Sequence, residues 1–303
     1  MKKLVIATRR SRLALWQANH IKHKLETLHA GLAVDLLPLS TRGDELLDRR
    51  LDQAGGKGLF VKELENAMAD ARADLAVHSM KDVPADLPAG FGIAAIAARE
   101  DARDVFLSSK FNRLQEMPAG TTVGTSSLRR SAQIAERFPG LEVRLLRGNV
   151  DTRLAKLERG EYDAIVLAAA GLKRLGLEAS IRSHLEPDEM LPSPGQGALG
   201  IECLAARAEI AALVAPLADG PTTICVRAER AVSRALGGSC SLPLAAYAEV
   251  NAKVIRLRAL VASSDGKRVV RCQVEGDAAD PQGLGESAAA ELRRQGAEEI
   301  LGI

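Results

Sequence analysis

The sequence predicts an α/β protein built from two strand–helix lobes and a smaller α+β domain. Short apolar runs alternate with helix-like segments from Lys3 to about Ala97 and again from about Arg103 to Leu191, which is typical of α/β units with parallel strands. From about Pro221 the pattern changes to a helix that ends at Gly237, followed by strands with the hairpin signal Asp265–Gly266 and by a last helix.

Two short connections join the lobes. The first is the charged segment Arg99–Asp104, and the second is Pro192–Gly197, which leads into the strand-like Ala198–Glu202. Two crossings predict a hinged pair of lobes in which the chain returns to the first lobe. The predicted domains are a first lobe of 1–98 with 198–216, a second lobe of 103–191, and a C-terminal α+β domain of 220–303 whose last helix covers about 281–295.

The first lobe begins with the apolar run Leu4–Ala7, which predicts a strand. The polar turn Thr8–Ser11 follows, and then a helix-like segment begins. Its Ile21, Leu25 and Leu28 recur at the spacing of one helix face, so we expect that face to be buried.

A second apolar run, Leu75–Val77, predicts a buried strand that ends at the motif His78–Pro84. Lys81 and Asp82 come where this strand should end, and ligands of open α/β sheets bind outside the carboxyl ends of the strands. Pro84 prevents the chain from continuing as a strand or starting a helix at once. A surface ion pair is the simpler interpretation, but this charged pair is well placed to meet a substrate.

Three strand-to-helix turns combine hydroxyl groups with arginine. They are Thr8–Ser11, Thr125–Arg130 after the strand Thr122–Gly124, and Arg147–Asn149 after the strand Val143–Leu146, with Asp151 or Thr152 as the N-cap and Arg153 one turn into the helix. Helix N-termini, hydroxyls and guanidinium groups bind anions, although such Ser and Thr residues are more often simple caps. Three of these turns predict a cleft for a polyanionic ligand whose carboxylates pair with guanidiniums.

The composition favours a soluble globular protein, since 47% of its 303 residues are apolar, 26% are charged and the net charge is +2. A nearly neutral chain with few aromatic residues is not expected to bind nucleic acid. No stretch approaches the length of a membrane span. The apolar run Leu4–Ala7 is too short for a signal peptide, so we expect a cytoplasmic protein without a membrane partner.

The cysteines are too widely spaced for a zinc site or a disulfide framework. Cys225 is expected to be a small core hydrophobe. Cys240 follows Gly237–Ser239, where its sulfur is reachable; inert exposure is the default and a reactive thiol is the alternative. His20 and His23 have no third ligand nearby in the sequence, so no metal site is predicted.

A set of short motifs runs in order along nearly the whole chain. They are Ile6–Arg9, Ala14–Ala18, Gly56–Glu65, His78–Pro84, Gly124–Arg130, Leu146–Val150, Tyr162–Ile165, Ala170–Leu172, Gly195–Ala198 and Gly237–Cys240. Each is short, but the ordered set is very specific. With these motifs the chain resembles the porphobilinogen deaminases, also called hydroxymethylbilane synthases, of tetrapyrrole (heme) biosynthesis.

The resemblance implies two lobes like those of type II periplasmic binding proteins, followed by a C-terminal domain. It implies a dipyrromethane cofactor held by a thioether to Cys240. It also implies a transferase that joins four porphobilinogen molecules head to tail, releases ammonia at each step and frees hydroxymethylbilane by hydrolysis. The implied partners are porphobilinogen and the growing oligopyrrole chain, and the enzyme is expected to be a monomer. Each pyrrole carries an acetate and a propionate, so the growing chain is a polyanion.

The resemblance also implies roles for single residues. Asp82 is the expected catalytic residue, because a carboxylate near the pyrrole nitrogen and the leaving ammonia stabilises the developing cation and moves protons. The residues implied to hold the cofactor are Lys81, Thr125, Ser127, Arg129 and Arg130. The residues implied to meet the substrate or growing chain are Arg9, Ser11, Phe60, Arg147, Arg153, Arg174 and Gln196.

Three residues depart from the family's usual pattern. Arg12, Pro194 and Gln53 stand where the family often has proline, valine and lysine, and none of these changes removes a catalytic residue. Gln53 lies in the charged, glycine-bearing segment Arg42–Gly58. That segment predicts a lid with Lys57 and Phe60 at its base, and an ordinary long surface loop is the alternative.

Two other classes of function remain as alternatives. A non-catalytic binding protein for an anionic small molecule has the same two-lobed fold, and a regulator that binds phosphate or nucleic acid is the second. The reachable Cys240, the Lys81–Asp82 pair and the expected lack of a signal peptide argue against the first. The nearly neutral charge argues against the second.

Overall fold

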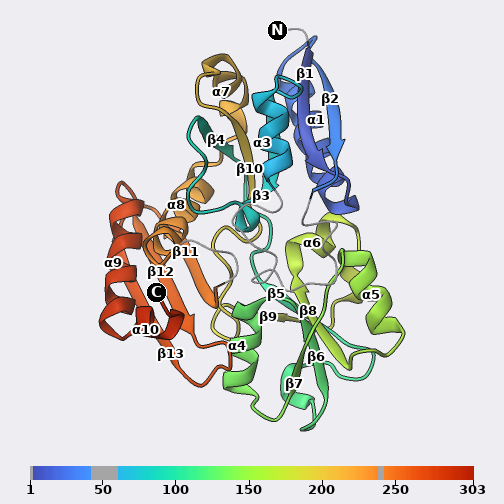
Figure 1. The fold of residues 1–303 in the computed structure, drawn as a ribbon, viewed down its shortest axis with the longest axis vertical. Helices are drawn as coiled ribbons and strands as arrows, with labels where there is room; N and C mark the ends of the chain where they lie inside the picture. The colour runs from blue at the N-terminus through green and yellow to red at the C-terminus, as the bar shows by residue number, and fades with distance from the viewer. Residues whose placement is uncertain (1–2, 42–60, 238–241) are drawn as a thin grey trace. The chain divides into compact units, whose positions relative to one another are not determined.

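The computed structural model describes residues 3–41, 61–237 and 242–303, which form three β-sheets with helices packed on them (Figure 1). The described chain separates into two compact units. The first unit extends to Glu100 and resumes over Ala198–Thr223, whereas the second combines Asp101–Gly197 with Ile224–Ile303. The second unit contains two of the three sheets, so this division into two units does not test the predicted limits of three domains, which stay a prediction.

The sheet of the first unit has the strand order β2-β1-β3-β10-β4. Its elements are β1 (Lys3–Arg9), α1 (Arg12–Leu28), β2 (Ala33–Leu39), α3 (Lys62–Ala69), β3 (Leu75–Ser79), the short 3-10 helix η1 (Met80–Asp82), β4 (Phe91–Ile96), β10 (Leu199–Leu204), α7 (Ala208–Val214) and the 3-10 helix η4 (Ala215–Leu217). β1 is parallel to β2 and β3, but β10 is antiparallel to both β3 and β4. The strands between Lys3 and Ala97, for which parallel strands were expected, thus run in one direction, whereas β10, which belongs to the returning chain, runs in the opposite direction.

The buried face of α1 follows the predicted spacing over most of its length. Ile21 and Leu25 are 0% exposed and pack in one cluster with Leu4 and Ile6 of β1. Burying side chains of this size stabilises the fold by roughly 1.5–3 kcal/mol each. Leu28, the last residue of α1, is 50% exposed, so the expectation of burial is wrong at that position.

The first sheet of the second unit repeats this arrangement, with the strand order β7-β6-β8-β5-β9. Its elements are β5 (Asp104–Leu107), the 3-10 helix η2 (Leu114–Glu116), β6 (Thr122–Thr125), α4 (Leu128–Arg137), β7 (Glu142–Leu145), α5 (Val150–Glu158), β8 (Ala164–Ala168), α6 (Ala169–Arg174), the 3-10 helix η3 (Glu178–Ser180) and β9 (Ser183–Leu185). β6, β7 and β8 are parallel, and β5 is antiparallel to β8 and β9. The expectation of parallel strands is therefore wrong at β5, because in both lobes the strand that follows a crossing runs against the others.

The N-cap of α5 differs from the prediction. Asn149 caps the helix, since its side-chain oxygen accepts a hydrogen bond from the Thr152 backbone N–H at 2.9 Å. The helix begins at Val150, so Asp151 and Thr152 lie within its first turn. Asn is among the strongest N-cap residues. Its side chain has the capping role that the sequence analysis assigned to Asp151 or Thr152.

The third sheet has the order β11-β12-β13 and is antiparallel throughout. Its elements are α8 (Gly220–Ala235), β11 (Leu244–Asn251), β12 (Val254–Ala262), β13 (Val269–Asp277), α9 (Pro281–Arg294) and α10 (Ala297–Leu301). The predicted hairpin turn lies between β12 and β13, where Gly266 adopts a φ of +70° that suits glycine. The predicted last helix is α9, with Asp280 as its N-cap.

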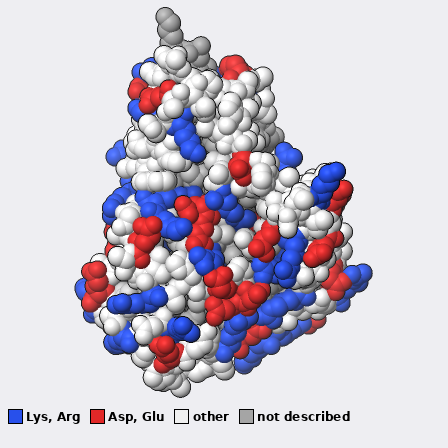
Figure 2. Space-filling model, turned by 180° about the vertical axis from the view of Figure 1, so that it is seen from behind, with Lys and Arg blue, Asp and Glu red and all other residues white. Residues whose placement is uncertain are grey.

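Among the described helices none is by itself long and apolar enough to cross a membrane. One sharply bent pair, α7–η4 with α8, has the length and the apolar composition of a membrane span, and no other feature of the described residues supports that role. On the face drawn in Figure 2, acidic side chains lie among the basic ones rather than in a separate field. This mixing is in keeping with the small net charge of +2.

A close approach between Met80 and Gly200 fixes the end of β3 against β10. A Cβ atom on Gly200 would lie 2.2 Å from the Met80 sulfur, and Met80 is 1% exposed. We expect Gly200→Ala to lower the free energy of unfolding by about 1–3 kcal/mol, because the buried methionine has to move. Gly92→Ala on the neighbouring β4 is the matched control, since nothing lies within 4 Å of its added Cβ. Urea unfolding measures both, and equal stabilities would contradict this packing.

Asp163 provides a test of acid stability in the second unit. Its carboxylate accepts hydrogen bonds from Lys110 Nζ at 2.6 Å and from the Thr122 backbone N–H at 2.8 Å, and these lower the pKa of Asp163 from 3.8 to about 2. A lowered native pKa stabilises the fold above the unfolded value and loses this effect as the pH falls toward 2. Asp163→Asn should therefore be less stable than the parent near neutral pH, by about 1–3 kcal/mol. The difference should shrink below about pH 4; a difference that stays constant with pH in urea unfolding would refute the assignment.

Candidate active site

Asp82 and Lys81 lie in the η1 turn directly after β3, and both are half-buried. The turn is fixed through its backbone: the Met80 N–H donates to the Ala198 carbonyl at 3.0 Å, and the Val83 N–H donates to the Met80 carbonyl at 3.2 Å. The two charged side chains therefore start from a rigid frame at the carboxyl end of the strand, as the sequence predicts.

Buried polar side chains also hold the end of β3. Gln17 of α1 donates from Nε2 to the Ser79 hydroxyl at 2.9 Å. His78 Nε2 lies 2.8 Å from a carboxylate oxygen of Glu202 on β10, and both side chains are almost inaccessible. Burial raises the pKa of the nearby Glu65, and the charge of Glu202 adds to that rise. These contacts connect α1, β3 and β10 immediately before the Asp82 turn.

Arg9 is the last residue of β1, the parallel neighbour of β3, and Ser11 comes two residues later. Because parallel neighbours end at the same edge of a sheet, Arg9 and the Asp82 turn leave it on the same side. Ser11 is the N-cap of α1, and its hydroxyl accepts from the Ala14 N–H at 3.3 Å. The capping interpretation thus accounts for the Ser11 hydroxyl in this structure.

In the second unit, Thr125 and Ser127 form the turn from β6 into α4. The Thr125 hydroxyl accepts from the Ser127 N–H at 3.2 Å, and the Ser127 hydroxyl accepts from the Arg130 N–H at 3.4 Å. Ser127 is the N-cap of α4, so this turn has the predicted cap. The cap places Arg129 and Arg130 in the first turn of the helix.

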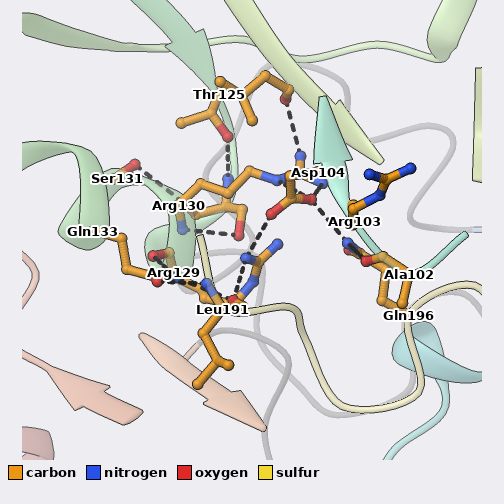
Figure 3. Close-up of polar contacts among 12 residues, drawn as sticks. Ala102, Arg103, Asp104, Thr125, Arg129, Arg130, Ser131, Gln133, Leu191 and Gln196 are labelled. Atoms are coloured by element: carbon orange, nitrogen blue, oxygen red, sulfur yellow. Dashed lines mark hydrogen bonds and ion pairs between the residues drawn. The ribbon is translucent and has the colours of Figure 1, made fainter. Parts of the chain in front are cut away.

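Arg129 and Arg130 converge on a residue that the sequence analysis did not single out, Asp104 of β5 (Figure 3). Arg129 Nη1 donates to Asp104 Oδ2 at 2.7 Å, whereas Arg130 donates to Oδ1 from Nη2 at 2.8 Å and from Nε at 3.1 Å. Arg130 Nη1 also donates to the Val166 carbonyl at 3.0 Å. We name Asp104, Arg129 and Arg130 the Asp104 triad; all three side chains are buried.

Gln196 belongs to the same network. It is 0% exposed, and its Nε2 donates to Asp104 Oδ1 at 2.8 Å and to the Ala102 carbonyl at 2.6 Å. In this structure it is therefore a partner of the Asp104 triad, and the substrate contact implied by the resemblance stays a prediction.

The triad carries more positive than negative charge. Burial alone would raise the pKa of Asp104, but the charges of Arg129 and Arg130 outweigh it and hold that pKa well below its usual range. Burial lowers the pKa of Arg129, which nonetheless stays charged as guanidiniums do. One carboxylate thus faces two guanidiniums in a buried site, where an unbalanced charge is costly.

Arg129 retains a donor that the protein does not use. Its Nε is buried and has no hydrogen-bond partner among the described residues. Because a buried unsatisfied N–H costs about 1–3 kcal/mol, this atom together with the excess positive charge indicates the site of an anion. A ligand carboxylate fits both requirements.

The other predicted arginines of the second unit lie just after a strand of the same sheet or on a helix that follows one. Arg153 of α5 donates from Nε to the Gly148 carbonyl at 2.8 Å and lies 3.4 Å from the Ser126 hydroxyl. Arg174 of α6 is buried and donates to the Gly197 carbonyl at 2.6 Å. Arg147 is half-buried just after β7. The structure thus brings Arg153 to the turn that precedes Ser127, and it attaches Arg174 to the Pro192–Gly197 segment.

Cys203 and Cys272 are free thiols; Cys203 is buried, and so is Cys225, as predicted. Burial raises the pKa of Cys272 to about 11, so little of it is thiolate at neutral pH. Cys240, Phe60 and the predicted lid Arg42–Gly58 lie outside the described residues. In the described part of the chain no group of His, Cys, Asp or Glu side chains could hold a metal ion.

Asp104 and Gln133 are the main members of the site that sequence reasoning missed. Gln133 of α4 fixes the Leu191 backbone, accepting from its N–H at 2.8 Å and donating to its carbonyl at 3.1 Å. For Asp104 there was one signal, a carboxylate at the start of the otherwise apolar run Val105–Leu107. For Gln133 there was none, since a glutamine on a helix is ordinarily exposed.

Comparisons with known proteins identify the family of this chain. Residues 4–212 match the sequence family "Porphobilinogen deaminase, dipyromethane cofactor binding domain", and residues 223–294 match "Porphobilinogen deaminase, C-terminal domain". The porphobilinogen deaminase of Bordetella parapertussis is 57% identical over 301 residues, which are 99% of this chain and 96% of that protein. The one from Methylobacillus flagellatus is 54% identical over 300 residues, 99% and 97% of the two chains.

Among solved structures, the methionine-binding protein MetQ matches with a TM-score of 0.47 and 12% identity, over 71% of this chain and 89% of that one. The two family matches together extend over nearly the whole chain, and the relatives named above are similar to it from end to end. The structure has two five-stranded sheets of mixed direction with helices packed on them, and a three-stranded antiparallel sheet with its own helices in the C-terminal part. The chain belongs to the porphobilinogen deaminase family, whose members are hydroxymethylbilane synthases.

Proposed function

We propose a division of labour for the family's reaction, in which four porphobilinogen molecules are joined head to tail on a covalently bound dipyrromethane and released as hydroxymethylbilane. Asp82 handles protons and developing charge, and the arginines of the second unit hold carboxylates. The observation that carries this proposal is the buried, unpartnered Nε of Arg129 within a triad that has one positive charge in excess.

The second unit is suited to the dipyrromethane. Each of its pyrroles carries an acetate and a propionate, and carboxylates of this kind accept strong hydrogen bonds from a buried guanidinium N–H. Arg129, Arg130, Thr125 and Ser127 would hold these groups from the start of α4. The family resemblance implies that Lys81 holds the cofactor as well. When bound, the dipyrromethane supplies the pyrrole carbon to which the first substrate is joined.

Asp82 is proposed as the catalytic residue. In each condensation the C–N bond of the porphobilinogen aminomethyl group breaks, ammonia leaves, and the pyrrole nitrogen bears the developing positive charge. The aminomethyl group leaves as ammonia from its protonated form. A carboxylate placed beside that N–H stabilises the developing charge, and it can then accept the proton that the pyrrole loses when the new bond has formed. The backbone of η1 holds Asp82 in place, so it need not be reoriented at each step.

The remaining predicted residues are proposed to bind the substrate and the growing chain. Arg9 and Ser11 would act from the edge of the first sheet, and Arg147, Arg153 and Arg174 from the edge of the second. Each added pyrrole brings two more carboxylates, so several guanidiniums at successive positions suit a chain that lengthens in place. Phe60 is proposed to contact the chain as well.

We further propose that the enzyme acts as a cytoplasmic monomer without nucleic-acid or membrane partners. The free thiols of Cys203 and Cys272 suit a reducing compartment. The small net charge and the mixed surface charges give little attraction for a polyanionic nucleic acid.

The attachment of the cofactor to Cys240 is tested by mass. Formation of the thioether breaks the C–N bond of an aminomethyl group, forms a C–S bond and releases ammonia. We expect Cys240→Ala to yield folded protein with no covalent adduct and no activity. Cys272→Ala, which removes a thiol with a pKa of about 11, should keep the adduct. The denatured intact mass measures both; an adduct that survives in Cys240→Ala would rule out the attachment.

The role of Asp82 is tested by Asp82→Asn, which keeps the shape and removes the charge. Turnover should fall about a hundredfold or more, the scale of one acid–base or electrostatic group, whereas cofactor content should remain. Asp70→Asn, which alters an exposed carboxylate at the end of α3, is the control in the same unit. Steady-state rates with porphobilinogen decide the matter, and near-normal turnover of Asp82→Asn would overturn the assignment.

A further inference from the structure

We propose that Asp104 is the positioning residue for cofactor loading: its carboxylate orients both guanidiniums of the triad, so that Arg129 keeps its Nε–H free to receive a dipyrromethane carboxylate. This inference rests on the proposed function of Arg129 and Arg130. Asp104 lies in none of the motifs that indicate the family, and it is 0% exposed, so it acts through the arginines rather than on the ligand.

The two oxygens of Asp104 have different partners. Oδ1 accepts from Arg130 Nε, Arg130 Nη2 and Gln196 Nε2, whereas Oδ2 accepts from Arg129 Nη1. A turn of the carboxylate about its own axis would break bonds to both arginines at once. The bidentate pair with Arg130 is the rigid kind of contact, and it therefore sets the direction in which Oδ2 meets Arg129.

Arg129 Nη1 is fully used by the protein. It has two N–H groups, and they meet Asp104 Oδ2 and the Leu191 carbonyl, each at 2.7 Å. The Leu191 backbone is itself held by Gln133. With Nη1 fixed at two points the plane of the guanidinium is fixed too, and the unpartnered Nε–H is held in one direction before any ligand arrives.

The charge of Asp104 matters as much as its shape. Without it, two buried guanidiniums would stand side by side with no counter-charge in the triad, which is strongly unfavourable. They would then separate, or they would take up a small anion from solution. In the second case an inorganic anion would occupy the place of the cofactor carboxylate, so Asp104 also keeps the site selective for the organic ligand.

The experiment measures cofactor loading in the full-length chain. The protein is produced in a host that makes no porphobilinogen, so that it is isolated as apoprotein, and porphobilinogen is then added. The appearance of the covalent adduct is followed by intact mass and expressed per folded molecule, with folding checked by circular dichroism. The variants are Asp104→Asn, Asp104→Glu, Arg129→Leu and Asp163→Asn. The last is the matched control, since Asp163 is a hydrogen-bonded carboxylate of the same lobe whose partners are Lys110 and Thr122.

We expect Asp104→Asn to load at least about tenfold more slowly than the parent, since one charged buried partner is lost. Asp104→Glu keeps the charge and should recover part of the rate, and Asp163→Asn should load within about twofold of the parent, as a distant site does. Added sulfate should slow Asp104→Asn more than the parent, because the unbalanced guanidiniums bind it. A purely structural role for Asp104 would not produce this sensitivity to sulfate.

Each outcome bears on a different claim. If Arg129→Leu loads normally, the proposed role of the arginines fails. If Arg129→Leu loads poorly while Asp104→Asn loads like the parent, only the positioning role of Asp104 is overturned. Slow loading of Asp104→Asn that is equalled by Asp163→Asn and is no more sensitive to sulfate than the parent would also overturn it. If Asp104→Asn does not fold, the loading rate of Asp104→Glu and its sensitivity to sulfate are compared with those of the parent instead.

Discussion

A single carboxylate buried between two guanidiniums is the constraint on which the site of the second unit depends. The negative charge of Asp104 lowers the free-energy cost of burying Arg129 and Arg130, since an unpaired guanidinium would be costly in a site without water. It does not neutralise both. We propose that the remaining positive charge and the unused N–H of Arg129 make the network a binding site rather than a core ion pair.

The topology explains why these groups lie at one edge. In each of these two five-stranded sheets four strands run in one direction, and one strand, which follows a crossing, runs in the opposite direction. In the first unit the parallel strands deliver Arg9 and the Asp82 turn to the same edge, and in the second they deliver the Ser127 cap and Arg147. Asp104 differs, because it opens the antiparallel strand β5 and so enters the site from the opposite direction.

The local features of the site were predictable because they depend on neighbours in sequence. The cap at Ser127, the strand before Asp82 and the hairpin at Gly266 all follow from residues a few positions apart. The N-cap of α5 was assigned wrongly because Asn149, Asp151 and Thr152 are all good capping residues in adjacent positions. Leu28 has the right spacing for the buried face, but it is the last residue of its helix and stays half exposed.

The interactions that complete the site join residues far apart in sequence, and no local pattern indicates them. Asp104 is 25 and 26 residues from its two arginines, and Gln133 is 58 residues from Leu191. The direction of β10 is likewise absent from its apolar pattern, since a strand has the same periodicity whichever way it runs. Only the family resemblance carried information about function across such distances. The comparisons support an enzyme and not the alternative of a non-catalytic binding protein.

The central claim is that the triad is organised before the cofactor arrives. A crystal structure of the apoprotein, isolated from a host that makes no porphobilinogen, tests it most directly. The account predicts that Asp104 lies within about 2.7–3.2 Å of both guanidiniums and that Arg129 Nε has no protein acceptor. An Arg129 side chain turned away from Asp104, or an Arg129 Nε bonded to another protein group, would contradict it.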